Sequence, residues 1–127
     1  MRVRETLLRR RRRECEERRR YVAELRLLGV RLRADAEQLR LEIAQAGAAG
    51  GPPDTARMLV ERHSHLERSI AAVERQIGAA RDDLATAEQE LRRQELARAR
   101  HARAASRSNP GAARRARSAA PRRPPRA

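Results

Sequence analysis

Residues 47–54 of this 127-residue chain read Gly-Ala-Ala-Gly-Gly-Pro-Pro-Asp, and this short stretch decides the fold. Glycine and proline both interrupt regular helices, so their clustering here predicts a loop. The segments on either side, residues 2–46 and 55–105, are long and contain no proline. Asp54 or Thr55 can cap the second segment as a helix. The arrangement predicts two long helices joined by one short connection.

Both segments carry small or apolar residues at the two heptad positions that face a partner helix, here called seam positions. In the first segment these are Cys15, Val22, Leu25, Gly29, Leu32, Ala36, Leu39, Ile43 and Ala46, and in the second Leu59, Leu66, Ile70, Val73, Ile77, Ala80, Leu84, Ala87 and Leu91. A short loop between long helices favours an antiparallel hairpin. The expected fold class is all-α: a long antiparallel two-helix coiled-coil hairpin, with helices at 2–46 and 55–105, a loop at 47–54, and a disordered Arg/Pro/Ala-rich basic tail at 106–127. An intermolecular bundle would use the same heptads, so the oligomeric state stays open.

The sizes of the seam residues predict how the two helices are aligned. Pairing residues whose numbers add to 102 sets Ile43 against Leu59 and Gly29 against Val73. Small residues then face larger ones, as close packing requires. Sliding one helix by a heptad would set Gly29 against Ala80 and leave a void. We therefore expect the first alignment.

The seam changes character toward the N-terminus of the first helix. Arg4, Arg11 and Arg18 fall on seam positions there, and Gln94 and Arg98 occupy the facing end of the second helix. A buried unpaired charge costs several kcal/mol (order of magnitude). This end is therefore expected to be splayed, solvated or completed by a partner.

The composition excludes several classes of protein. All 31 basic residues are arginine, against 17 acidic residues, and Tyr21 is the one aromatic residue. The apolar content is mostly Leu, Ala and Val. No enclosed pocket can be lined with these residues, so we expect a non-enzymatic protein without a cofactor. The single cysteine, Cys15, cannot form an internal disulfide, which suits a reducing compartment. No apolar run reaches the length of a membrane span, and we expect a cytoplasmic protein.

The positive charge is concentrated at the two ends of the sequence. Residues 1–20 have a net charge of +6, residues 21–95 a net charge of −2, and residues 96–127 a net charge of +10. A hairpin brings the two basic ends together. One end of the rod is thus predicted to be strongly electropositive, which favours an acidic cavity, a nucleic acid or an anionic membrane surface as its partner.

The residues that commonly carry chemistry do not form a reactive site. His63 and His65 are two residues apart, so they point in different directions from a helix and do not share a metal ion. Cys15 lies on the seam, far along the hairpin from both histidines. The glycines of the loop lack the strand, the spacing and the lysine of a phosphate-binding loop. We expect no catalytic, cofactor-binding or metal-binding residues.

The N-terminal 25 residues resemble a known family. Met1-Arg2-Val3-Arg4-Glu5-Thr6-Leu7-Leu8-Arg9 is similar to the opening of FliJ-type flagellar export proteins, particularly those of alphaproteobacteria. Glu16-Glu17-Arg18-Arg19-Arg20-Tyr21-Val22-Ala23-Glu24-Leu25 then resembles the acidic pair, basic triplet, Val-Ala and aliphatic residue of that group. Beyond the loop, Asp54 and residues 68–84 are compatible with it. The chain departs from the group at Arg10 and Arg13, where apolar residues are usual, and in its tail.

The resemblance implies an antiparallel coiled coil that acts as a stalk of the flagellar type III export apparatus. Such proteins insert into the ring of the export ATPase and link it to the export gate protein, and export chaperones are further partners. The implied place is the cytoplasm, at the inner-membrane face of the flagellar base, with peripheral membrane association as an option. The residues carried over as the ATPase contact are Arg4, Leu7, Leu8, Arg9, Arg18, Arg19 and Arg20, to which the seam argument adds Arg11. The gate contact is expected nearer the loop.

Two other functions remain open at this stage. The first is a non-specific nucleic-acid-binding protein, in which the arginine-rich tail neutralises phosphates. The tail lacks aromatic residues for base stacking and shows no base-reading motif. The second is a structural coiled-coil scaffold with no link to an ATPase. The identity of the partner distinguishes these functions from the export stalk.

Overall fold

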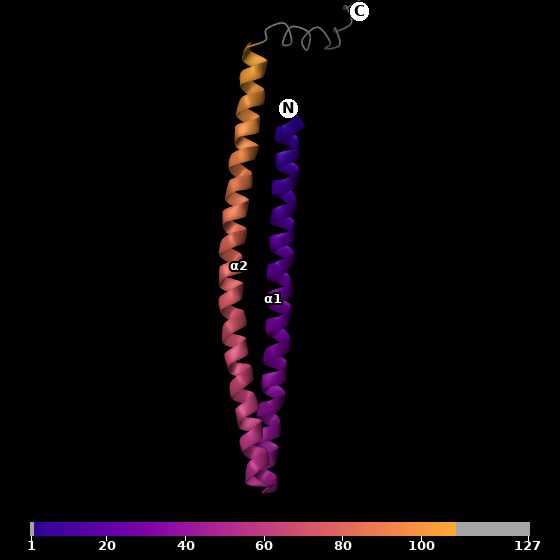
Figure 1. The fold of residues 1–127 in the computed structure, drawn as a ribbon, viewed down its shortest axis with the longest axis vertical. Helices are drawn as coiled ribbons and strands as arrows, with labels where there is room; N and C mark the ends of the chain where they lie inside the picture. Colours follow the sequence, from indigo (N-terminus) through magenta and orange to yellow (C-terminus); the bar gives the residue numbers. More distant parts are fainter. Residues whose placement is uncertain (1, 109–127) are drawn as a thin grey trace, which may run out of the picture.

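The computed structural model describes residues 2–108 and consists of two long helices packed side by side in opposite directions (Figure 1). Helix α1 covers Arg2–Ala49 and helix α2 covers Pro53–Ser108. The expected all-α hairpin is confirmed. Residues 106–108, expected in the tail, belong to α2, and the rest of the expected tail, 109–127, lies outside the described residues.

The loop is shorter than the sequence predicted, because α1 continues through Gly47, Ala48 and Ala49. Alanine is the strongest helix former, so the two alanines extend the helix despite the preceding glycine. The helix ends at Gly50, whose φ of +65° is a left-handed conformation that glycine adopts without penalty. The backbone N–H of Gly51 then donates to the carbonyl of Ala46 at 3.4 Å, which completes a Schellman-type helix end.

Helix α2 begins with proline rather than with the expected cap. Pro53 occupies the first helical position, where its missing N–H would have had no partner. The carbonyl of Pro52 accepts hydrogen bonds from the N–H groups of Thr55 (3.1 Å) and Ala56 (3.4 Å). Asp54 and Thr55 therefore lie inside the first turn, and the negative charge of Asp54 stabilises the positive end of the helix dipole.

The seam follows the alignment in which facing residue numbers add to 102. A β-carbon added to Gly29 would lie 3.7 Å from Cγ1 of Val73 and 3.9 Å from Cδ1 of Ile77. Further along, Val22 and Leu25 pack in one cluster with Ala80, Ile77 and Leu84. The buried seam residues are Leu8, Cys15, Val22, Leu25, Gly29, Ala36 and Leu39 of α1 and Val73 and Ala80 of α2. The alignment predicted from residue size is confirmed.

Neither helix is long and apolar enough to cross a membrane, as judged over residues 2–108.

Candidate functional site

The open end of the hairpin is formed by the start of α1 and the end of α2. In the observed alignment Arg4 lies opposite Arg98, so residues 102–108 of α2 extend past the start of α1 (Figure 1). Residues 96–108 contain four arginines and no acidic residue. The open end thus combines a paired segment with a projecting basic turn of helix.

The two helices stay paired at this end. Leu8 is 3% exposed and Cys15 is 1% exposed, so the seam remains closed well beyond the last regular heptad. An ion pair between Arg98 and Glu5, 3.1 Å apart, joins the helices close to the start of α1. The expectation of a splayed end is therefore wrong for the described residues. Of the alternatives named from sequence, a solvated end fits the structure.

The seam arginines avoid burial by placing their guanidinium groups at the solvent-exposed edge of the interface. Nη1 of Arg18 donates a hydrogen bond to the backbone carbonyl of Asp83 at 3.0 Å. Nη1 of Arg11 lies 3.6 Å from the carboxylate of Glu14, one turn along the same helix. A long aliphatic stem lets arginine cover apolar surface while its charge reaches water. Positive charge therefore borders the seam rather than destabilising it from within.

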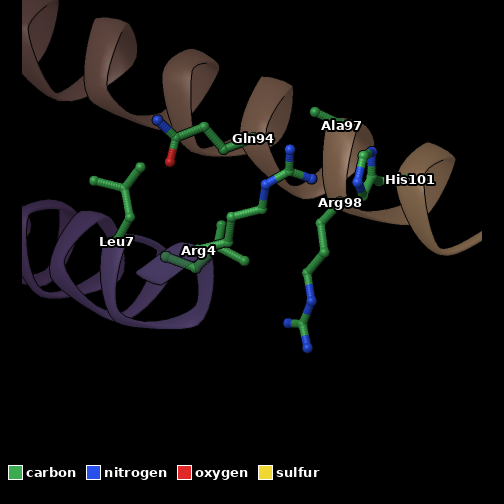
Figure 2. A pocket seen from close by; sticks show the side chains of 7 residues that line it. Arg4, Leu7, Gln94, Ala97, Arg98 and His101 are labelled. Atoms are coloured by element: carbon green, nitrogen blue, oxygen red, sulfur yellow. The ribbon is translucent and has the colours of Figure 1, made fainter. Parts of the chain in front are cut away.

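A surface groove of about 300 Å³ lies across the open end. Its lining residues are Arg4, Leu7, Leu8, Gln94, Ala97, Arg98 and His101. In Figure 2 the guanidinium of Arg4 lies beside α2 near Gln94, whereas the side chain of Arg98 extends away from it. Oε1 of Gln94 is buried and accepts no hydrogen bond among the described residues. An apolar floor flanked by arginines suits a partner that presents acidic side chains.

The sequence-predicted contact residues differ in how exposed the structure leaves them. Most are exposed: Arg4, Leu7, Arg9, Arg18, Arg19 and Arg20. Leu8 is instead buried in the seam and is not available to a partner in this conformation. Arg11 is partly buried. Leu8 belongs to the core because it lies one heptad before Cys15, on the same seam position.

Sequence reasoning missed a row of ion pairs along one edge of the coiled coil. Arginines of α1 face glutamates of α2 in pairs whose numbers add to 107, and we call this row the charged ladder. The pairs formed are Arg12–Glu95 at 3.5 Å, Arg19–Glu88 at 3.3 Å, and Arg33–Glu74. The signal was present in the sequence as arginines at 12, 19, 26, 33 and 40, which recur every seven residues.

The ladder changes toward the loop. Arg40 turns to Glu37 on its own helix at 2.7 Å, and this hydrogen bond holds the pKa of Glu37 below its ordinary value. Glu67, which would face Arg40, lies 3.7 Å from Nε2 of His63. Within residues 2–108 no group of three or more metal-ligating side chains comes together, around His63 and His65 or elsewhere.

Comparison with models of known families, with curated proteins and with solved structures finds no match for this chain. The geometry described above gives two candidate surfaces: the basic open end with its groove, and the charged ladder on one edge. Such surfaces bind other macromolecules through shape and charge.

Proposed function

We propose that this protein is a non-enzymatic stalk of the flagellar type III export apparatus. Its basic open end inserts into the ring of the export ATPase, and the rod links that ring to the export gate protein at the inner-membrane face of the flagellar base. The resemblance of residues 1–25 to FliJ-type proteins supports this function. The observation that carries it is the placement of Arg4, Arg11 and Arg18 on seam positions of the end that would enter the ring.

The free hairpin gains only exposed polar contacts from arginine at these positions, such as the hydrogen bond from Arg18 to the carbonyl of Asp83. Leucine there would pack against the facing helix, whereas arginine places a charge at the edge of the interface. Charge at this end has a use if the end meets acidic side chains. Ion pairs across such an interface contribute to specificity and to the rate of association more than to affinity.

The dimensions of the rod suit a connection between two partners. Helix α1 has 48 residues, which corresponds to a length of about 70 Å. The basic charge lies at the open end, and residues 21–95 carry a slight net negative charge. One end can therefore enter an acidic cavity while the remainder stays accessible to a second protein.

Replacing the seam arginines by leucine tests this function. In the double variant Arg11→Leu/Arg18→Leu, the new side chains face Leu91 and Leu84, so the midpoint of thermal unfolding should rise. The same variant should co-purify less with the flagellar export ATPase and should reduce swimming in the host cell. The matched control is Arg31→Leu/Arg68→Leu, which removes the same charge from exposed positions outside the seam. It should leave ATPase binding unchanged.

Two results would overturn the proposal. The first is a double seam variant that binds the ATPase and supports swimming as well as the parent protein, which would favour a scaffold without an ATPase link. The second is a parent protein that does not bind the ATPase but binds duplex DNA with an affinity that falls steeply as salt rises. This result would favour the nucleic-acid-binding function.

A further inference from the structure

The charged ladder contains one rung of like charge. Arg26 of α1 and Arg81 of α2 have numbers that add to 107, as the ion-paired rungs do. Among the described residues neither arginine takes part in an ion pair. Two facing arginines repel each other, so this rung destabilises the hairpin, whereas the ion-paired rungs on either side stabilise it. The rung lies near the middle of α1 and is separate from the open end.

A surface groove of about 340 Å³ lies between these two arginines. Its lining residues are Arg19, Val22, Ala23, Arg26, Arg81, Leu84, Ala85 and Glu88. Val22 and Leu84 belong to the hydrophobic cluster of the seam and form the apolar part of the groove. Of its three arginines, Arg19 is paired with Glu88 at 3.3 Å, so the groove offers Arg26 and Arg81, unpaired among the described residues, as two cations beside an apolar floor.

Each arginine of this rung has a small residue next to it on at least one side along its helix. Residues three before and four after a helical position share its face. For Arg26 these neighbours are Ala23 and Val30, and for Arg81 they are Gly78 and Ala85. A β-carbon added to Gly78 would meet no atom within 4 Å. The surface next to Arg81 is therefore open on the side of Gly78.

We propose that this groove is a docking site for an acidic helical segment of a partner protein. A carboxylate of the partner lies between Arg26 and Arg81, where two guanidinium groups supply charge-assisted hydrogen bonds. An apolar side chain of the partner covers Val22 and Leu84. The partner helix then supplies the negative charge that the ladder lacks at this rung.

The charges on either side of the rung favour an acidic protein segment over a nucleic acid. The next glutamates of the ladder on α2 are Glu74 and Glu88, one heptad away in each direction. A polyanion that follows the rod would meet both of them. One carboxylate between Arg26 and Arg81 has only Glu88 in the same groove, and the charge of Glu88 is already balanced by Arg19 at 3.3 Å. The groove shares Arg19 with the residues expected to contact the ATPase. The proposal does not depend on the export function, because it rests on Arg26 and Arg81, which are not among those residues.

The test uses the full chain and a fluorescein-labelled helical peptide with Leu–Glu pairs as the probe. Binding is followed by fluorescence anisotropy at physiological salt, where weak long-range attraction is screened. Arg26→Gln/Arg81→Gln should weaken peptide binding about tenfold. The control Arg31→Gln/Arg68→Gln removes the same charge from exposed positions elsewhere and should change affinity less than about twofold. Equal losses in the two variants would mean general attraction to a basic chain and would overturn the proposal.

A second variant separates docking from fold stability. Arg26→Glu completes the rung with Arg81, so the midpoint of thermal unfolding should rise while peptide affinity falls. A higher midpoint with unchanged peptide binding would show that the rung affects the hairpin alone, and the docking site would be wrong. Duplex DNA could displace the peptide from the parent protein but not from Arg26→Gln/Arg81→Gln. That result would show that the groove binds nucleic acid instead.

Discussion

Gly29 is the position where a single substitution tests the packing of this hairpin most directly. It lies in the interior of α1, it is buried, and it faces Val73 across the seam. Glycine in the middle of a helix is unfavourable because it loses more backbone freedom on folding than alanine does. We expect Gly29→Ala to stabilise the protein.

The magnitude follows from two contributions. Alanine is favoured over glycine inside a helix by about 1 kcal/mol. The new methyl group would lie 3.7 Å from Val73 and 3.9 Å from Ile77, which are ordinary van der Waals distances, so it adds buried apolar contact without a clash. The free energy of unfolding should therefore rise by about 1 to 2 kcal/mol. For a domain of about 100 residues, each kcal/mol raises the midpoint by about 4–8 °C.

The assay is thermal unfolding followed by circular dichroism, with Gly78→Ala as the matched control. A β-carbon at Gly78 would meet nothing within 4 Å, so this variant reports helix propensity alone. Gly29→Ala should raise the midpoint at least as much as Gly78→Ala, and the difference measures the added contact in the seam. If Gly29→Ala lowers the midpoint while Gly78→Ala raises it, the helices are closer at this point than the structure places them, and the reasoning is refuted.

Two further predictions concern the alignment of the helices and the stability that one ion pair of the ladder contributes. Cysteines introduced at Leu32 and Ile70 in a Cys15→Ser background should form a disulfide readily under mild oxidation, because these seam positions face each other; preferred crosslinking of Leu39 with Ile70 would instead indicate a helix slid by one heptad. Reversing one charge of the exposed rung Arg33–Glu74 (Arg33→Glu or Glu74→Arg) should lower the free energy of unfolding by up to about 1 kcal/mol, and reversing both charges should restore it. No recovery in the double variant, measured by urea unfolding, would show that this rung contributes nothing.

The sequence was sufficient to predict the architecture and the alignment because both depend on residue size and spacing. The heptads define the faces in contact, and the fit of Gly29 to Val73 selects one alignment of those faces. The ends of the helices were predicted less well. Gly47 was grouped with the breakers, yet it is Gly50 that adopts the left-handed conformation ending α1. Composition marks where a loop falls, whereas the conformation of one residue sets where the helix stops.

The open end shows a second limit of prediction from sequence, which concerns where individual side chains lie. Arginine on a seam position suggested separated helices, because a buried charge is costly. The length of the side chain removes that cost, as Arg18 shows by reaching the carbonyl of Asp83 from a closed seam. Conversely, Leu8 looked like a contact residue from the resemblance, and the continuing heptad buries it. Whether a side chain can reach solvent from the interface depends on the space around it, and only the three-dimensional structure gives that space.

The charged ladder alone does not select the alignment, because its arginines recur every seven residues and its glutamates mostly do so. Sliding α2 by one heptad would still set Arg19 against Glu95, and it would set Arg26 against Glu88. The like-charged rung at Arg26 and Arg81 is therefore a consequence of the seam, where Gly29 accepts Val73 rather than Ala80. One change at Arg26 to an acidic residue would relieve the repulsion without disturbing the seam. A rung that weakens the free hairpin and borders a groove with an apolar floor is understandable if a third, acidic element completes it.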